Sequence, residues 1–367
     1  MSRRSMRLGE VLDFYDHMRI PVSTIEREKM QGEYPYYGAQ GIIDHVNDYI
    51  FDGEYVLIAE DGANLVTRNQ PIAQIVRGRF WVNNHAHIVR GKEGVATNYF
   101  VNTLLNSMNL TGYVTGAAQP KLSQKSLRVV EVDLPSLAEQ KQICNLLSTY
   151  DDLIENNRRR IQLLEQAARL LYKEWFVHLR FPGHEHVKIK DGVPEGWEKK
   201  QVKDLLAKVK RPGKIQKADY LTDGPIPCVD QSREFIGGYT DQIETMIDEL
   251  PMIVFGDHTR ILKFIDFPFA CGADGTQLLA THDPKISQEF FFFSLDAIDL
   301  SNYFYARHFK FLKDQHIPRP TDVLIHQFTG VARPILKQVK LLREQNGELA
   351  KARDLLLPKL MNGEVAV

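Results

Sequence analysis

Apolar residues recur along one stretch of the chain at alternating spacings of three and four. The spacing continues without a break through Leu147, Tyr150, Ile154, Asn157, Ile161, Leu164, Ala168, Leu171 and Trp175. This period is typical of a helix whose seam packs against another helix in a coiled coil. At 1.5 Å per residue, the seam would be about 42 Å long.

A weak internal repeat predicts a second helix of the same kind. Lys125, Leu127 and Pro135 recur at one constant offset as Lys310, Leu312 and Pro320. Applied to the first seam, that offset gives Ala332, Ile335, Val339, Leu342, Asn346, Leu349, Arg353, Leu356 and Leu360. We expect this helix to start near Pro334 and to be less regular, because Gly347 weakens its middle and Arg353 interrupts its seam.

The two seams would bury each other most simply if the helices packed together. The long segment between them lets the chain return, so we expect the second helix to lie antiparallel to the first. Asn157 and Asn346 fall on the two seams. We hypothesise that these amides meet and fix the register of the helices, as a single core Asn does in coiled coils.

Outside the two long helices, short apolar runs alternate with Gly, Asn and Asp. The runs predict strands at 55–59, 72–76, 87–90, 129–132 and 253–255, and helices at 97–108 and 287–298. The Phe290–Phe293 run is interpreted as core. The pattern predicts an α+β fold with two domains built on small twisted β-sheets, at 1–135 and 183–320, separated by long antiparallel coiled-coil helices in segments 136–182 and 321–367.

Composition and charge narrow the class of protein. The 367 residues include 46 Lys and Arg against 47 Asp and Glu, so nucleic-acid contacts would have to come from local patches. The three cysteines form no C-x-x-C pair, which argues against a disulfide framework and favours a reducing cytoplasm. Without an apolar signal segment or a run of about 18 apolar residues, we expect neither export nor a membrane span.

Motifs of catalysis are missing from the sequence. It contains no Walker-type, G-x-G-x-x-G, H-E-x-x-H or G-x-S-x-G pattern, and no [DN]-P-P-[YF] stretch. The pairs His85/His87 and His184/His186 have no obvious carboxylate or thiolate set beside them, so we expect no metal site. We therefore expect a chain that is not itself an enzyme.

Two stretches are locally basic, which favours contacts with DNA phosphates. Residues 64–92 contain five basic residues and no acid, and residues 199–217 contain eight basic residues against Asp204 alone. Polar side chains that can reach phosphates or base edges lie in or near these stretches. The candidate DNA-binding residues are Tyr36, Tyr37, Arg77, Arg79, Asn83, Asn84, His85, Gln119, Lys121, Arg211, Lys214, Gln231, Arg233, Arg260, Arg307, His308 and Lys310.

Several motifs in this order resemble the DNA specificity (S) subunits of type I restriction-modification enzymes. They are Tyr36-Tyr-Gly-Ala-Gln-Gly-Ile-Ile-Asp44, Trp81-Val-Asn-Asn-His85, Thr115-Gly-Ala-Ala-Gln-Pro-Lys121, Leu134-Pro-Ser-Leu-Ala-Glu-Gln140, Phe309-Lys-Phe-Leu312 and Leu355-Leu-Leu-Pro-Lys-Leu-Met-Asn-Gly-Glu364. The resemblance covers essentially the whole chain. It implies two target-recognition domains that each read one half of an asymmetric bipartite site on double-stranded DNA.

The resemblance also implies partners and the location of the chemistry. Two methyltransferase (M) subunits would carry S-adenosylmethionine and modify adenine N6, and restriction (R) subunits would carry ATP and Mg, so this chain would hold no cofactor. Two alternatives stay open from the sequence. A coiled-coil scaffold would bind only protein, and a self-contained nuclease or methyltransferase would be active alone.

Overall fold

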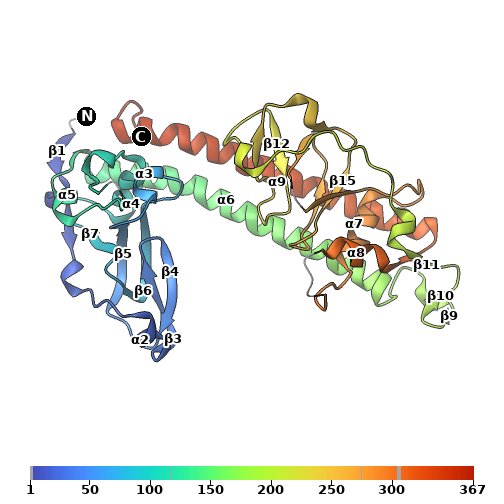
Figure 1. Cartoon of the computed structure of the whole chain (residues 1–367). Helices are drawn as coiled ribbons and strands as arrows, with labels where there is room; N and C mark the ends of the chain where they lie inside the picture. Colours follow the sequence, from blue (N-terminus) through green and yellow to red (C-terminus); the bar gives the residue numbers. More distant parts are fainter. Residues whose placement is uncertain (1–2, 117, 274, 304–306) are drawn as a thin grey trace. The chain divides into compact units, whose positions relative to one another are not determined.

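The structure is a computed structural model, and it describes residues 3–116, 118–273, 275–303 and 307–367. The chain packs into two compact units. Unit 1 consists of Met1–Asn156 and Gln345–Val367, and unit 2 consists of Asn157–Glu344. Each unit therefore combines a globular α+β part with a portion of both long helices (Figure 1).

A six-stranded sheet is the framework of unit 1, and its strand order is β2-β7-β5-β6-β3-β4. The strands are β2 (Leu12–Phe14), β3 (Gln31–Gly38), β4 (Gly41–Val46), β5 (Phe51–Ala59), β6 (Ala73–Val82) and β7 (Ala86–Gly91). Helix α4 (Asn98–Ser107) packs on this sheet, because Phe100 and Leu105 share a buried cluster with Val56 of β5. The helix begins where the Thr97 hydroxyl accepts a hydrogen bond from the Phe100 amide at 3.2 Å.

A smaller antiparallel pair, β1 (Arg4–Arg7) and β8 (Glu131–Leu134), brings the first strand of the chain beside the segment that leads into the first long helix. Helix α5 (Gln124–Arg128) precedes β8. The short helices α1 (Leu8–Val11), α2 (Thr24–Glu28) and α3 (Asn64–Thr67) connect the strands. The sequence located every expected strand of this unit within a few residues.

In unit 2 the strands divide between several small sheets. A four-stranded sheet has the order β13-β12-β17-β14, and a three-stranded sheet has the order β16-β15-β18. The strands are β12 (Ile226–Val229), β13 (Gly238–Thr240), β14 (Met246–Ile247), β15 (Met252–Gly256), β16 (Leu262–Ile265), β17 (Phe269–Cys271) and β18 (Thr276–Leu279). Two-stranded pairs join β9 (Ile189–Lys190) to β10 (Val193–Pro194) and β11 (Glu198–Gln201) to β19 (His316–Arg319).

Helices α7 (Gln288–Asp296) and α8 (His308–Asp314) complete the globular part of unit 2. The hydroxyl of Ser287 caps α7 by accepting a hydrogen bond from the Phe290 amide at 3.1 Å. All four side chains of the Phe290–Phe293 run are buried, as expected from the sequence. They form an aromatic core with the long helices, in which the Phe290 and Phe328 rings lie 6.1 Å apart.

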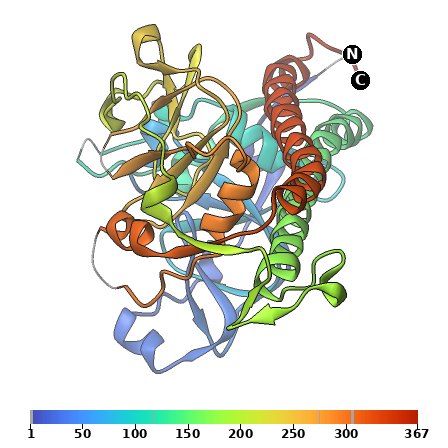
Figure 2. The same ribbon diagram turned by 90° about the vertical axis from the view of Figure 1, so that its right-hand side faces the viewer.

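The long helices are α6 (Leu137–Tyr172), which continues as a π-helical turn at Lys173–Val177, and α9 (Asp322–Asn362). They run side by side in the views of Figures 1 and 2. In unit 1, Asp151 pairs with Arg353 at 2.6 Å, and Asn346 Nδ2 donates to the Ile154 carbonyl at 3.3 Å. In unit 2, Glu165 pairs with Arg343 at 2.6 Å, and the Tyr172 and Phe328 rings lie 5.7 Å apart. Residue numbers fall along α9 as they rise along α6, so the helices are antiparallel within each unit.

The expected seam positions all face inward to some extent. On α6, Leu147, Ile154, Asn157 and Ala168 are buried, and the half-buried seam residues are Tyr150, Ile161, Leu164, Leu171 and Trp175. On α9, the buried seam residues are Ala332, Val339, Leu342 and Leu360, and the half-buried ones are Ile335, Asn346, Leu349, Arg353 and Leu356. Pairing of Asn157 with Asn346 stays a prediction.

The start of the second helix was predicted wrongly. Helix α9 begins at Asp322, twelve residues before Pro334, and continues through both Pro334 and Gly347. A proline ring clashes with the carbonyl four residues earlier, but here that position is the exposed Gly330, and Phe328 and Val339 anchor the helix on either side. Arg353 does not simply interrupt the seam, because its guanidinium pairs with Asp151.

None of the helices in the described ranges combines the length and apolarity that a bilayer crossing requires.

Candidate nucleic-acid interface

Four segments of unit 1 meet at one place, which we call loop cluster 1: residues 37–38, 60–62, 83–85 and 118–121. The Asn83 amide donates to the Tyr37 carbonyl at 2.9 Å, and the Glu60 amide donates to the His85 carbonyl at 2.9 Å. Gly62 joins the last segment by donating to Pro120 at 3.1 Å. The fold thus brings together the candidates Tyr37, Asn83, Asn84, His85, Gln119 and Lys121.

The two cationic candidates in loop cluster 1 each face a carboxylate of the same unit. Lys121 Nζ lies 3.1 Å from Glu60 Oε1, and His85 Nδ1 lies 2.6 Å from Asp61 Oδ2. About half of each side chain is exposed, at 54% for Lys121 and 48% for His85. Asn84 and Gln119 are also exposed. A phosphate at this surface would therefore compete with Glu60 for Lys121.

Two candidates of the first domain are buried, so their side chains are poorly placed for the predicted contact with DNA. The Tyr36 side chain is fully buried, and its hydroxyl accepts from the Val22 amide at 3.0 Å. Asn83 is 8% exposed, and its Oδ1 accepts from the His85 amide at 2.8 Å, which shapes the loop rather than presenting an amide to DNA. The Tyr37 ring is half-buried and lies edge-on to Phe80, with their centroids 5.7 Å apart.

Beneath loop cluster 1 lies a buried network of charged side chains that the sequence did not reveal as a site. His87, 1% exposed, places Nδ1 2.7 Å from Asp16 Oδ2 and Nε2 2.7 Å from the Leu122 carbonyl. Arg19 donates to Glu60 Oε2 at 2.7 Å. Burial raises the pKa of Asp16 and Glu60. The hydrogen bonds and charges of His87, the Ile88 amide and Arg19 at Asp16, and of Arg19, His87 and Lys121 at Glu60, together outweigh burial, so both pKa values lie below their usual range.

The pair His85/His87 does not converge on a common ligand. His85 is exposed beside Asp61, whereas His87 is buried beside Asp16. Within the described ranges, no group of three or more His, Cys, Asp or Glu side chains is placed to hold a metal ion. A sequence signal for the role of His87 does exist, since it is a polar residue within the otherwise apolar run of β7.

The basic stretch at 64–92 is not a free cationic patch. Strand β5 places Asp52 opposite Arg79 and Glu54 opposite Arg77, and the two ion pairs measure 3.2 and 2.8 Å. Arg68 donates to the Asn106 carbonyl at 2.8 Å, and the other two cations are also engaged: Arg90 stacks over the Tyr55 ring, and Lys92 donates to Gly9. Predicted phosphate contacts of Arg77 and Arg79 would therefore have to break cross-strand pairs.

In unit 2, loops at adjacent strand ends form loop cluster 2: residues 208–217, 230–234 and 257–260. Parallel pairing of β12 and β17 puts their carboxyl ends together, and Ile215 bridges to Gly272 just after β17. The His258 amide donates to Gln231 Oε1 at 3.1 Å. Gly275 has a φ of +68°, and a Cβ there would lie 2.5 Å from His258, so this close approach of the loops requires glycine.

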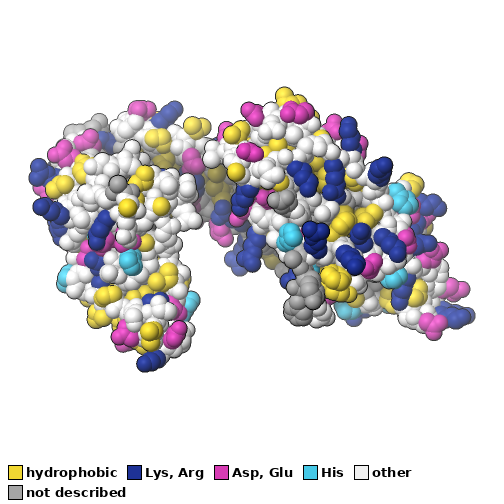
Figure 3. All heavy atoms as spheres, in the orientation of Figure 1, with side chains coloured by type: hydrophobic (Ala, Val, Ile, Leu, Met, Phe, Trp, Pro, Cys, Tyr) yellow, Lys and Arg dark blue, Asp and Glu magenta, His cyan; other side chains and the backbone are white. Residues whose placement is uncertain are grey.

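Exposed lysines of loop cluster 2 lack the carboxylate partners found in loop cluster 1. Lys208, Lys210, Lys214 and Lys217 are exposed, and no acidic side chain of the described residues lies within ion-pair distance of any of them. Arg211 is also exposed, and it donates to Gln277 Oε1 on β18 at 2.9 Å. Figure 3 shows Lys and Arg side chains spread over the visible face of this unit.

The remaining candidates of unit 2 differ in accessibility. Arg233, Arg260, Arg307 and Lys310 are exposed, and Gln231 is half-buried. Arg260 is tethered because its guanidinium donates to the Leu300 carbonyl at 3.0 Å. His308 is 6% exposed and its Nδ1 and Nε2 lie 2.8 and 3.0 Å from the Asp257 and Tyr303 carbonyls, so it is poorly placed for its predicted contact with DNA.

A buried lysine supports loop cluster 2 from below. The Lys263 side chain is 4% exposed, and its ammonium donates to the Glu234 carbonyl. Its Nζ lies 3.9 Å from Asp230 Oδ1, an oxygen that also accepts from the Ser232 amide at 2.9 Å. Burial lowers the pKa of Lys263 despite the opposing charge of Asp230.

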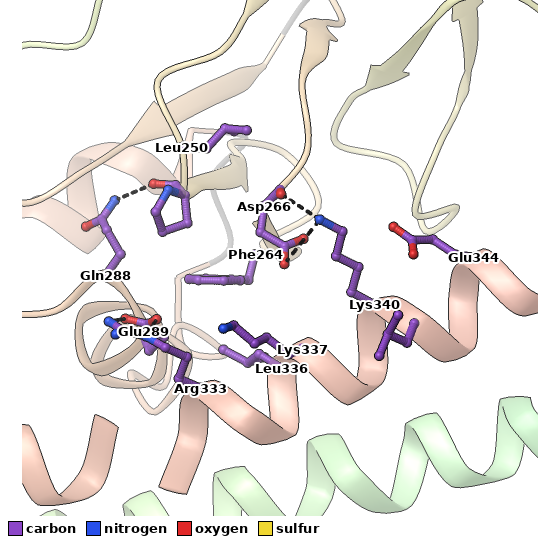
Figure 4. A pocket seen from close by; sticks show the side chains of 12 residues that line it. Leu250, Phe264, Asp266, Gln288, Glu289, Arg333, Leu336, Lys337, Lys340 and Glu344 are labelled. Carbon is purple, nitrogen blue, oxygen red and sulfur yellow. Dashed lines mark hydrogen bonds and ion pairs between the residues drawn. The ribbon is translucent and has the colours of Figure 1, made fainter. Parts of the chain in front are cut away.

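A hollow of about 720 Å³ lies elsewhere in unit 2, between α9 and the sheets (Figure 4). Phe264, Leu336 and Leu341 give it apolar walls. Its ion pairs join Arg333 to Glu289 at 2.6 Å and Lys340 to Asp266 at 3.8 Å. Because these charged side chains pair with one another, we interpret the hollow as a structural groove and not as a reaction centre.

Comparisons with known proteins decide the family. Residues 4–166 match the family model described as the type I restriction modification DNA specificity domain. The MjaIX specificity subunit of Methanocaldococcus jannaschii is 26% identical over an alignment covering 94% of this chain and 90% of that relative. The chain belongs to the specificity subunits of type I restriction-modification systems.

Other relatives of the specificity subunit agree. A putative type I specificity subunit of Haemophilus influenzae is 39% identical over 140 residues, which cover 38% of this chain and 35% of that relative. The crystal structure of the S subunit from M. genitalium has the same fold, with a TM-score of 0.62, 14% identity and coverage of 98% of this chain and 99% of that one. A specificity subunit is the non-catalytic DNA-recognition component of its enzyme.

Proposed function

We propose that this specificity subunit reads a bipartite, asymmetric DNA site, with loop cluster 1 on one half-site and loop cluster 2 on the other. The observation that carries the proposal is the presence of two separate polar loop clusters of different composition, one in each unit. A dimer of identical domains would read a palindrome, whereas two different clusters suit two different half-sites. Segments 1–135 and 183–320 would be the recognition domains, with spacer segments at 136–182 and 321–367.

Within loop cluster 1, exposed Asn84 and Gln119 are the side chains best suited to base edges, because amides pair with adenine through two hydrogen bonds. Within loop cluster 2, Arg211, Arg233 and Arg260 are exposed and could pair with guanine in the same bidentate way. Exposed Arg307 is a further candidate for base edges. Lys121, Lys214 and Lys310 would contact phosphates, which fix the position of the protein but carry no sequence information.

We further propose that the long helices hold two M subunits, which supply S-adenosylmethionine and methylate adenine N6, and that R subunits supply the ATP- and Mg-dependent steps. Support comes from α6, where Leu163, Leu170 and Val177 are each more than half exposed and recur every seven residues. A helix face of that kind suits another helix. The proposal leaves this chain free of cofactors and places it in the cytoplasm.

Sequencing of methylated bases in the native genome, with and without this gene, tests the proposal. We expect one asymmetric two-part motif that disappears when the gene is deleted. The changes Asn84→Ala and Gln119→Ala should make one half of the motif degenerate and leave the other half intact. A palindromic motif, or a motif that survives deletion, would contradict the proposal.

A further inference from the structure

Both ring nitrogens of His87 face hydrogen-bond acceptors. Nε2 lies 2.7 Å from the Leu122 carbonyl, and Nδ1 lies 2.7 Å from Asp16 Oδ2. A carbonyl oxygen carries no proton. Asp16 is ionised, because the Ile88 amide donates to its Oδ1 at 2.8 Å, Arg19 lies 3.8 Å from its Oδ2, and the hydrogen bonds and charges around this carboxyl together outweigh burial and hold its pKa below the usual range. Both nitrogens must therefore carry a proton, which makes the buried ring an imidazolium.

Charged groups from three elements surround this imidazolium. Asp16 and Arg19 come from the 3-10 turn η1 (Asp16–Met18) and the residue after it, Glu60 follows β5, and Lys121 precedes Leu122. Glu60 Oε2 lies 3.7 Å from His87 Nδ1 and 2.7 Å from the Arg19 guanidinium. The two carboxylates thus share three cations, and loss of the His87 charge would leave Asp16 facing a ring lone pair.

The contact to Leu122 connects this network to the DNA-facing residues. The Leu122 amide donates to the Glu60 carbonyl at 2.8 Å, while its carbonyl accepts from His87. Both backbone polar groups of Leu122 are therefore fixed, one residue after Lys121 and three residues after the exposed Gln119. The Asp16 carboxylate extends the same network to β7, because Oδ1 accepts from the Ile88 amide at 2.8 Å.

We propose that the His87 imidazolium is a positioning residue for loop cluster 1, so that unit 1 reads its half-site with a pH dependence that unit 2 does not share. This inference rests on the proposed bipartite recognition. Loop cluster 2 is held instead by the ammonium of Lys263, which donates to the Glu234 carbonyl. The support of unit 1 is thus an imidazolium and the support of unit 2 is an ammonium, so neutralisation of the His87 ring would affect unit 1 alone.

Binding of the wild-type complex of S and M subunits to defined duplexes tests the pH dependence without any substitution. The probes are a duplex with the methylated motif of the genome and two duplexes in which one half-site is scrambled. A cleavage reagent attached at Ala118→Cys, an exposed position of loop cluster 1, identifies the half-site next to unit 1. Discrimination at that half-site should fall about tenfold as rising pH removes the proton from the His87 ring, while discrimination at the other half-site stays constant.

The variant His87→Gln separates charge from hydrogen bonding, because its amide can still donate to Leu122 but carries no charge. We expect its discrimination at low pH to equal that of the wild type at high pH, without further pH dependence. The control His186→Gln changes a histidine that is 84% exposed in unit 2 and should keep the wild-type profile. Equal pH profiles at both half-sites would overturn the role of His87, whereas a wild-type complex without two-part recognition would overturn the proposed function itself.

Discussion

Loop clusters 1 and 2 hold their cations in opposite ways. In unit 1, Lys121 and His85 lie against Glu60 and Asp61, and even the basic strand β6 is matched by acids on β5. In unit 2, four exposed lysines of residues 208–217 have no acidic partner among the described residues. The difference indicates that the exposed lysines of unit 2 can attract DNA phosphates without breaking ion pairs within the protein. In unit 1, contacts with DNA would replace existing ion pairs.

The two units also differ in what the arginines of helix α9 contact. Arg343 in unit 2 pairs with Glu165 and also lies over the Phe235 ring at 3.6 Å from its centroid, next to loop cluster 2. Arg353 in unit 1 pairs with Asp151 and with its helical neighbour Asp354. One helix arginine therefore supports a recognition loop, and the other links only the helices.

The largest effect is expected from Arg343→Ala. It removes the pair with the partly buried Glu165 and the cation–π contact with Phe235, so unit 2 should lose about 2 kcal/mol of stability. The matched change Arg353→Ala in unit 1 should cost about 1 kcal/mol or less, since Asp151 is about half exposed. Hydrogen exchange of the full chain would assign each loss to its unit. A cost for Arg353→Ala equal to that for Arg343→Ala would remove this contrast.

An intermediate effect is expected from the double change Lys210→Ala and Lys214→Ala. Each lost phosphate contact lowers the slope of log affinity against log salt by about one, so the slope for the assembled complex should fall by about two and affinity by about tenfold. The control pair Lys188→Ala and Lys190→Ala removes exposed lysines outside loop cluster 2 and should leave the slope unchanged. Similar slopes for both pairs would contradict the assignment of residues 208–217 to DNA.

A structural feature can be predicted from the sequence when the residues that determine it lie within one short segment of the chain. Periodicity located the helix seams and the five strands that it predicted, because it depends on neighbouring positions along one element. The start of α9 was misjudged because the buried Phe328 and Leu324, rather than the local preference of Pro334, decide where that helix forms.

Features of the site were harder to predict because they depend on strand pairing. The window at 64–92 is basic along the sequence, but register places Asp52 and Glu54 across from Arg79 and Arg77. Adjacent Tyr36 and Tyr37 point to opposite faces of β3, and only the tertiary structure reveals that Tyr36 is the buried one. His87 could be noticed as a histidine, but its partners Asp16 and Leu122 are distant in the sequence.

The smallest effect is expected from Lys121→Ala in unit 1. Glu60 already neutralises Lys121, so formation of a phosphate contact releases less counterion and its loss should lower the salt slope by less than about one. The affinity of the assembled complex should fall no more than about threefold at low salt, less than for the lysine pair of unit 2. The control Lys310→Ala removes an exposed candidate phosphate contact on α8 of unit 2 and should lower the slope by about one. If Lys121→Ala lowers the slope as much as Lys310→Ala does, the ion pair with Glu60 does not restrain Lys121, and the electrostatic contrast between the two loop clusters disappears.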